Sequence, residues 1–364
     1  MNLRDLVRLR LRNQLLSRTG PRRPEDVVTW MGAVQAQEYA FAKWGVGLRL
    51  RDGTTDADVE RACDAGRILR THVMRPTWHF VTPADIGWLQ KLTGPKVQRL
   101  SLPYNQRLGL DTRALVRGVA AIERALRDRQ YLTRAELGER LRRAKLPAEG
   151  PALAQVAMHA EAEGVICSGP RRGKQFTYAL IAERAPAPFA LSRDEAIATL
   201  ARRYLQSHGP ATLRDFVWWS GLATADARRG YEIVRARAEQ CDGVDYWTVG
   251  PDSRAAAKDH RVHLLPIYDE YIVAYRDRFA VPHGPANEKS PAGQSVTFRH
   301  ALLVDGQIAG TWYIDRASSG VSVDVTTFGR LAGAALREQE PAVQRFLRFI
   351  TAQVDDANGP AALH

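Results

Sequence analysis

The sequence has few cysteines and no long apolar run. Three of its 364 residues are cysteine (Cys63, Cys167 and Cys241), and no CxxC pair occurs. A scattered, odd set gives no disulfide framework, so we expect three reduced, partly buried thiols and a cytoplasmic location. No run of about 18 apolar residues is present, so we expect no membrane span. The Arg-rich N-terminus lacks an apolar block that ends in a cleavage site, so it does not form a secretory signal.

The sequence also lacks the motifs of several enzyme classes. It contains no Walker A motif, GxGxxG or GxSxG, so nucleotide hydrolysis, dinucleotide binding and serine hydrolysis have no sequence support. His260 and His263 are three residues apart, and in a strand such residues lie on opposite faces. No Cys/Asp cluster joins them. We therefore expect neither a metal nor a cofactor.

Lysine is scarce, but positive charge is not. Seven of the 52 basic residues are lysine, and the formal net charge is +12 with a pI near 9.9. A GC-rich genome explains the high ratio of arginine to lysine, but it does not explain the excess of basic over acidic residues. Such an excess fits a polyanionic partner, with nucleic acid the first candidate.

Three successive segments repeat one order of elements, helices followed by a β-hairpin. In the first, apolar residues at helical spacing predict helices over residues 3–16, 23–34 and 55–66. Two β-rich arms then flank Arg75-Pro76 over residues 68–82. This order is typical of a winged helix.

The second and third segments follow the same pattern. Helices are expected over 112–129, 132–144 and 151–164, with Thr133 and Glu136 forming a capping box. A hairpin over 165–181 follows, and its tip carries three cations, Arg171, Arg172 and Lys174. In the third segment, helices over 193–209, 211–222 and 224–239 precede a short strand at 244–250.

From about residue 261 the sequence becomes β-rich. Strands are expected within 261–275, 300–314 and 320–330, with Asp305-Gly306 as a hairpin turn. A helix over 341–354 closes this part. We therefore expect an α+β fold, mainly α, whose parts are three tandem winged-helix units (1–100, 101–185 and 186–258), a C-terminal β-barrel with its closing helix (259–354), and a disordered tail (355–364).

Two glutamines stand one residue apart after the second expected helix, in the stretch AVQAQEYAFAKWG. The helical stripe ends near Val34, and the residues after it show no comparable pattern. On a helix, Gln35 and Gln37 would point about 200° apart, whereas on an extended backbone they project to the same side. We therefore expect both side chains to leave the helix end and point into one cleft.

The sequence resembles the bacterial winged-helix DNA glycosylases of the AlkZ/YcaQ-like family. The resemblance rests on LRTHVMRPTWHFV, ARRYLQSHGPATLRDFVWWSGL and LLPIYDEYIVAYRDR, and it runs from about residue 8 to 350 in the same order. It implies three winged helices and a β-barrel around a concave, DNA-sized channel. The family's catalytic signature in the AlkZ branch is Gln-apolar-Gln, which Gln35-Ala36-Gln37 matches. The implied activity is excision of N7-alkylated guanine, including interstrand crosslinks in self-resistance to a DNA-alkylating natural product.

The chemistry of such a lesion suits neutral side chains. An N7-alkylguanine carries a positive charge and is already a good leaving group, so its C1′–N9 bond breaks without a strong base. A positioned water and oriented dipoles near the sugar cation are what help. We expect Gln35 and Gln37 to supply them. Glu38 and Asp269 are the candidate auxiliary acids, because general bases in glycosyl chemistry are usually carboxylates.

We expect alkylated double-stranded DNA as the partner, and a monomer located at the nucleoid. Arg171, Arg172 and Lys174 would neutralise phosphates, and the hairpin over 74–79 would pack beside the lesion through Arg75, Trp78 and His79. The nearest lysine to the motif is Lys43, which does not adjoin it, so no lyase step is expected. The alternative is a non-catalytic winged-helix transcriptional regulator that reads one DNA sequence.

Overall fold

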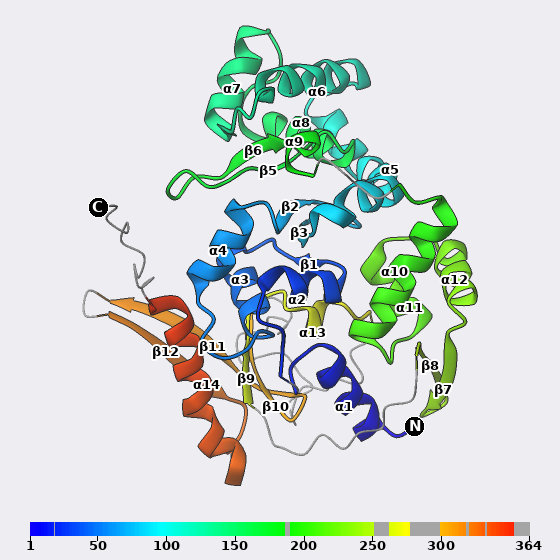
Figure 1. The fold of residues 1–364 in the computed structure, drawn as a ribbon, viewed down its shortest axis with the longest axis vertical. Coiled ribbons are helices and arrows are strands. Elements are labelled where there is room, and N and C mark those ends of the chain that lie inside the picture. The colour runs from blue at the N-terminus through cyan, green and yellow to red at the C-terminus, as the bar shows by residue number, and fades with distance from the viewer. Residues whose placement is uncertain are drawn as a thin grey trace, which may run out of the picture.

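The structure of the protein is a computed structural model, which describes residues 1–17, 19–185, 190–250, 262–276, 299–317, 320–331 and 333–352. The chain forms three units of helices and a hairpin, followed by a C-terminal sheet. In Figure 1 the second unit lies above the first, the third lies beside the first, and the curled sheet with its helix lies below them. Helix α1 (Leu3–Asn13) comes before the first unit in the chain and lies between the third unit and the sheet.

The first unit carries the two glutamines. Its elements are α2 (Pro24–Met31), β1 (Val34–Gln35), α3 (Tyr39–Gly47), α4 (Asp56–Asp64), β2 (Leu69–His72) and β3 (Trp78–Val81). The strands form an antiparallel sheet in the order β1-β3-β2. The sheet therefore places β1 beside the hairpin formed by β2 and β3.

The second unit follows a long connecting helix, α5 (Pro83–Arg107). Its elements are α6 (Thr112–Leu126), β4 (Leu132–Thr133), α7 (Arg134–Arg143), α8 (Gly150–Ala162), β5 (Ile166–Ser168), β6 (Thr177–Leu180) and α9 (Ile181–Arg184). Its sheet has the order β4-β6-β5. The predicted capping box at Thr133 and Glu136 is present at the start of α7.

The third unit packs against the first. Its elements are α10 (Arg193–His208), α11 (Leu213–Ser220), α12 (Thr224–Ile233), β7 (Arg237–Cys241) and β8 (Val244–Thr248). A backbone bridge joins Ala211 to Trp247, so a short extended segment again lies between the first two helices of the unit. All three units thus share one order: helix, extended segment, helix, helix, hairpin.

The C-terminal part is an open sheet and one long helix. Its elements are β9 (Val262–Leu265), α13 (Glu270–Val273), β10 (His300–Val304), β11 (Gln307–Ala317), β12 (Gly320–Thr327) and α14 (Gly333–Thr351). The strand order is β12-β11-β10-β9, all antiparallel. The predicted turn is present, with Asp305 and Gly306 both at positive φ.

Three apolar cores hold these parts together. One joins the first unit's helices to the C-terminal sheet and α14. A second joins the β2–β3 hairpin and α5 to the third unit, and it includes Ala274 and Tyr275 after α13. The third belongs to the second unit. The glutamine strand therefore lies where the first two cores meet.

Several sequence predictions differ from the structure. Residues 39–47 form α3 although their sequence carries no clear helical pattern, and α2 ends at Met31 because Gly32 takes positive φ. The described C-terminal strands form a half-barrel with free edges at β9 and β12, not a closed barrel. Residues 270–273 form a helical turn rather than a strand, since Asp269 caps it.

The predicted boundaries also differ in places. The expected limit between the first two units, at residues 100 and 101, lies inside α5, which continues to Arg107. Residues 237–241 are a strand rather than the end of a helix. The predicted tail at 355–364 lies outside the described residues. Among the helices that the structure describes, none is long and apolar enough to cross a membrane.

A glycine in the third unit fixes how closely it approaches the β2–β3 turn. Gly221 has φ +71°, and a Cβ there would lie 2.1 Å from the carbonyl oxygen of Met74. Gly243 has a similar φ of +76° but open space around it, so it serves as a control. We expect Gly243→Ala to cost about 1–2 kcal/mol of backbone strain, and Gly221→Ala to cost a further 1–3 kcal/mol, roughly, from the clash. Urea unfolding measures both, and equal costs would contradict the close approach.

Candidate active site

Gln35 is the last residue of β1, and Gln37 follows two residues later at a bend. Gln35 is paired with His79 across β1 and β3, and the Ala36 N–H donates to the Trp78 carbonyl oxygen at 2.7 Å. The backbone is therefore extended through Ala36, and side chains two residues apart on such a backbone point to the same face. Gln35 and Gln37 are both half-buried.

Each glutamine oxygen is held by a donor from the β2–β3 turn. The Arg75 guanidinium donates to Gln35 Oε1 at 2.9 Å, and the Trp78 N–H donates to Gln37 Oε1 at 3.4 Å. Both partners can only donate, so they fix which end of each amide is oxygen. Within the described ranges neither NH₂ group donates to another residue. Each oxygen also keeps a second lone pair for a water or a substrate.

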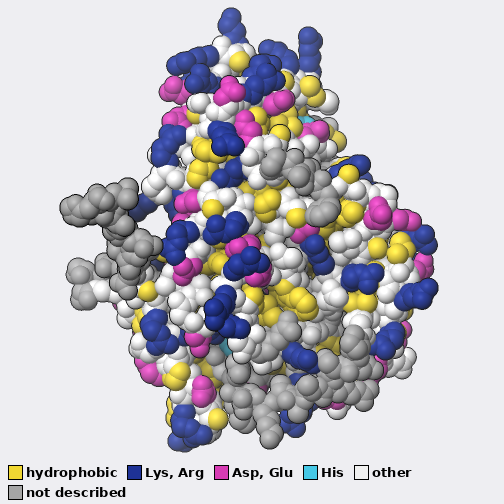
Figure 2. Space-filling view, in the orientation of Figure 1, with side chains coloured by type: hydrophobic (Ala, Val, Ile, Leu, Met, Phe, Trp, Pro, Cys, Tyr) yellow, Lys and Arg dark blue, Asp and Glu magenta, His cyan; other side chains and the backbone are white. Residues whose placement is uncertain are grey.

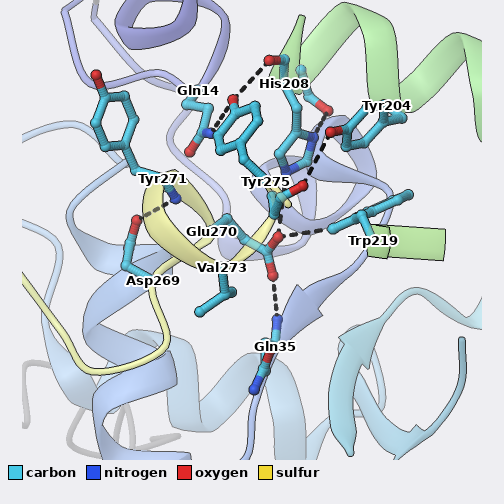
Figure 3. Close-up of polar contacts among 12 residues, drawn as sticks. Gln14, Gln35, Tyr204, His208, Trp219, Asp269, Glu270, Tyr271, Val273 and Tyr275 are labelled. Carbon is cyan, nitrogen blue, oxygen red and sulfur yellow. Dashed lines mark hydrogen bonds and ion pairs between the residues drawn. The ribbon is translucent and has the colours of Figure 1, made fainter. Parts of the chain in front are cut away.

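The buried side chain of Glu270 binds the backbone of β1. Figure 3 shows Glu270 between Gln35, Trp219 and His208. The Gln35 N–H donates to Glu270 Oε1 at 2.7 Å, and the Trp219 indole N–H donates to Oε2 at 2.9 Å. His208 Nε2 lies 3.4 Å from Oε2. Burial alone would raise the pKa of Glu270, but His208 and the Gln35 N–H outweigh it and lower that pKa to about 2.

The neighbouring acid, Asp269, has a different partner. Both of its oxygens accept hydrogen bonds at 2.7 Å from the Arg49 guanidinium, and both side chains are about 1% exposed. Asp269 also caps α13 through the Tyr271 N–H. A carboxylate so fully engaged is not available as the auxiliary acid that the sequence suggested. The acid beside the glutamine strand is Glu270.

Arg75 lies in a strained turn beside Gln35. The preceding residue, Met74, is buried and has φ +62°, a conformation that is unfavourable for a bulky side chain and that often marks a functional site. Burial lowers the pKa of Arg75. Its guanidinium lies 5.9 Å from the Trp218 ring centroid and forms no ion pair with a described residue. Arg75 therefore brings a cation without a direct ion-pair partner in the described residues to the glutamine strand, although Glu270 acts on its charge from a distance.

Trp78 and His79 have separate positions. Trp78 is half-buried, with the Arg70 guanidinium 4.2 Å from its ring centroid and the His72 ring 4.5 Å away. His79 is fully buried, and burial followed by the charge of Arg75 lowers its pKa to about 3. A neutral, enclosed imidazole does not reach a DNA surface. Its position opposite Gln35 makes His79 part of the support of the strand, contrary to the predicted DNA contact.

The cationic hairpin tip of the second unit is partly neutralised by its own acids. Arg171 lies 3.6 Å from Glu60 on α4, and its N–H donates to Asp64. Arg172 forms an ion pair with Glu136 at 2.7 Å. The side chain of Lys174 is exposed and has no partner among the described residues. The tip thus docks on the first unit through Arg171 and leaves Lys174 open.

Two further residues near the motif were considered from the sequence. Glu38 is exposed and stands as the N-cap residue of α3, without a side-chain cap bond. Lys43 is 4% exposed, and its ammonium group binds Asp56 at 2.7 Å and Glu60 at 2.5 Å. A lysine held in this way is a poor amine nucleophile.

The charge of the viewed surface agrees with a nucleic-acid partner. Figure 2 shows that Lys and Arg cover more of the viewed face than Asp and Glu do, above all on the second unit. In the ranges that the structure describes, no group of three or more His, Cys, Asp or Glu side chains could hold a metal ion.

Comparisons with known proteins agree on one family. The family model described as DNA glycosylase AlkZ-like matches residues 28–349. A curated relative, an interstrand DNA cross-link repair glycosylase from Streptomyces sahachiroi, is 25% identical over 331 residues, which cover 85% of this chain and 87% of that protein. The solved structure of Streptomyces sahachiroi DNA glycosylase AlkZ superposes with a TM-score of 0.78 at 23% identity, and covers 95% of this chain and 96% of that one.

The fold and the family model together define a DNA-repair enzyme. The chain belongs to the AlkZ-like family of DNA glycosylases. DNA is therefore its substrate class, and the family match favours the enzyme over the non-catalytic regulator.

Sequence reasoning missed two residues that hold the motif. Glu270 was not among the candidate acids, because the sequence does not distinguish it from the adjacent Asp269 and both side chains are buried. Arg70 was not singled out, although its guanidinium donates to the Ala36 carbonyl at 3.0 Å and to the Gln37 carbonyl at 3.3 Å. No pattern in the short strand β2 marks Arg70, whose role appears only in its tertiary contacts.

The lowered pKa of Glu270 predicts a pH-dependent stability. Its contribution is fully present above the unfolded-state pKa of about 4.3 and is lost as pH falls towards the folded value of about 2. The Glu270→Gln variant should therefore lose about 3 kcal/mol or less at pH 7, and the gap to the wild type should narrow between pH 4.3 and 2. Urea unfolding across this range measures it, with the exposed Glu338→Gln as control. A gap independent of pH would contradict an ionised Glu270.

Proposed function

We propose that this chain is a monofunctional DNA glycosylase for cationic N7-alkylguanine lesions, with Gln35 and Gln37 as its catalytic residues. The observation that carries the proposal is the orientation of the pair. Gln35 ends β1 and Gln37 lies at the bend that follows, and obligate donors, Arg75 and the Trp78 N–H, hold both oxygens. Three repeated units of winged-helix type would dock on the DNA around this strand.

A neutral amide pair suits a leaving group that is already charged. When the C1′–N9 bond breaks, its electron pair leaves with the base, and a neutral 7-alkylguanine departs from an oxocarbenium-like sugar. Water then attacks C1′, and its proton passes to solvent. The second lone pair of each glutamine oxygen would orient this water, and the amide dipoles would stabilise the sugar cation. Neither glutamine has to accept a proton.

The groups around the pair fit DNA rather than a small substrate. Arg75, whose charge lacks a counter-ion in the described part, would bind the phosphate next to the lesion and keep Gln35 in place. Trp78 would pack beside the damaged nucleotide, and Lys174 would contact the backbone further along. Glu38 remains the candidate auxiliary acid, since it is exposed beside Gln37. The engagement of Lys43 by two acids supports the absence of a lyase step.

We further propose that the substrates include interstrand crosslinks. The curated relative carries that activity in its name. A glycosylase that unhooks crosslinks would protect a cell that makes a DNA-alkylating natural product, acting as a monomer on the nucleoid. Release assays on a monoadduct and on a crosslink made with the same agent distinguish a crosslink enzyme from one restricted to monoadducts.

The catalytic assignment is tested by base release from DNA that contains 7-methylguanine. We expect Gln35→Ala and Gln37→Ala each to lower the single-turnover rate roughly 100-fold, the typical loss when one oriented dipole is removed. Gln130→Ala, at an exposed position of the second unit, is the matched control and should match the wild type. Uracil, a neutral leaving group, should be released very slowly. Rapid uracil release, or full activity of both alanine variants, would refute the mechanism.

The hairpin tip gives a separate prediction for DNA affinity. Lys174→Ala should reduce the slope of log K against log salt by about 1, because one phosphate contact is lost. Arg172→Ala should change the slope less, since Glu136 already neutralises that guanidinium in the free protein. Fluorescence anisotropy with a labelled duplex between 50 and 200 mM salt, roughly, measures both slopes. An unchanged slope for Lys174→Ala would place this hairpin off the DNA.

A further inference from the structure

A cavity of about 390 Å³ lies between the first and second units, next to the glutamine strand. Its walls come from β2 and β3 of the first unit and from the sheet of the second unit. The residues that decide its chemistry are Arg70, Trp78, Glu161, Lys174, Phe176 and Tyr178. Its volume falls within the roughly 300–1,000 Å³ of small-molecule sites.

Aromatic side chains from both units line this cavity. Trp78 belongs to the first unit, whereas Phe176 and Tyr178 belong to the second. The Arg70 guanidinium lies 4.2 Å from the Trp78 ring centroid and 5.0 Å from that of Phe176. Phe176 is 40% exposed, so part of its ring remains open to a ligand beside its contacts with Tyr39, Arg70 and Arg171. A flat, unsaturated ring is the ligand shape that such walls favour.

A buried carboxylate supplies the polar specificity. Glu161 lines the cavity, yet it is only 2% exposed. Its Oε2 is bound by His72 Nδ1, whereas its Oε1 has no partner among the described residues. This oxygen can accept a hydrogen bond from a ligand in the cavity. The Watson–Crick edge of guanine offers two adjacent donors, the N1–H and the exocyclic amine. Adenine offers only its N6 amine beside an acceptor at N1, so it should bind the carboxylate more weakly.

Cations border the same cavity. Lys174 is exposed and has no partner in the described part of the chain. Arg134 is also exposed and lies at the start of α7, where its guanidinium donates to the Gly150 carbonyl. A phosphate beside these groups would be attached to the same ligand whose ring lies between the aromatic walls.

We propose that this cavity is a binding site for a guanine nucleotide, with the base against Phe176 and the Arg70 guanidinium, its Watson–Crick edge on Glu161 and its phosphate near Lys174. An unstacked nucleotide of bound DNA and a free nucleotide share this chemistry. DNA is the source if the proposed glycosylase function holds, on which this part of the inference rests. The cavity would then also act on the motif, because Arg70 forms its wall and holds the carbonyls of Ala36 and Gln37.

Direct binding of GMP, AMP and guanosine to the whole protein tests the site without any glycosylase activity. Isothermal titration calorimetry should show GMP at least about tenfold tighter than AMP. Glu161→Gln should abolish most of that preference, since a charge-assisted bond becomes a neutral one and the new amide can donate to AMP. The matched control is Glu163→Gln, an exposed acid two residues along the chain. It should retain the wild-type preference.

Lys174→Ala is a second test variant, needed because substitution of the buried Glu161 can disturb folding. Lys174 is exposed, and Lys174→Ala should lower the affinity for GMP several-fold while leaving that for guanosine unchanged. The proposal is overturned if GMP and AMP bind equally or neither binds at millimolar concentration. It is also overturned if both Glu161→Gln and Lys174→Ala leave every affinity unaltered.

A DNA arm separates the two sources. Duplexes with one bulged guanine, one bulged adenine or no bulge compete against labelled GMP. Stronger displacement by the bulged guanine identifies DNA as the source, whereas GMP binding without displacement by any duplex identifies a free nucleotide. Release of 7-methylguanine without nucleotide binding would refute this site and leave the proposed function intact. Nucleotide binding without release of 7-methylguanine would refute the proposed function and leave this site intact.

Discussion

The carboxylate of Glu270 is the contact on which the geometry of the site depends. It belongs to the short helix α13, and its three partners come from the strand β1, from α11 and from the end of α10. A buried charge costs several kcal/mol of lost hydration unless its donors compensate. The first unit, the third unit and the segment after β9 must therefore keep one arrangement. The end of the glutamine strand is fixed by the same requirement.

The chemistry of the glutamine pair follows from how its oxygens are held. A free amide can rotate and present either end. Arg75 and the Trp78 N–H can only donate, so each of them binds the amide oxygen. Two weak polar groups thereby become oriented dipoles, as the proposed excision of a cationic base would require. The strain at Met74 fits this view, because the same turn must present both donors to the strand.

The sequence predicted helices followed by a hairpin in the first two segments, the capping box at Thr133 and the turn at Asp305-Gly306, because local periodicity and turn chemistry determine these features. It assigned the helix over residues 3–16 to the first unit, where the structure has α3 instead. The family resemblance added what Gln35 and Gln37 could do. Tertiary contacts decided the rest. Helix α3 has no helical pattern in its sequence and is held by the first core. Asp269 and Glu270 are chemically alike, and only Arg49 on one side and Gln35 on the other assign them different partners.

Two opposite supports hold the Gln35–Gln37 segment, and they come from different parts of the molecule. Glu270 binds its first N–H from the side of the third unit, whereas Arg70 binds its last two carbonyls. Arg70 in turn contacts the second unit, through the bond from its own N–H to Ser168 and the stacking on Phe176. A change in how the second unit sits on the first would therefore reach the motif through Arg70. If the proposed function holds, DNA that spans both units would thereby help to position the glutamines that act on its lesion.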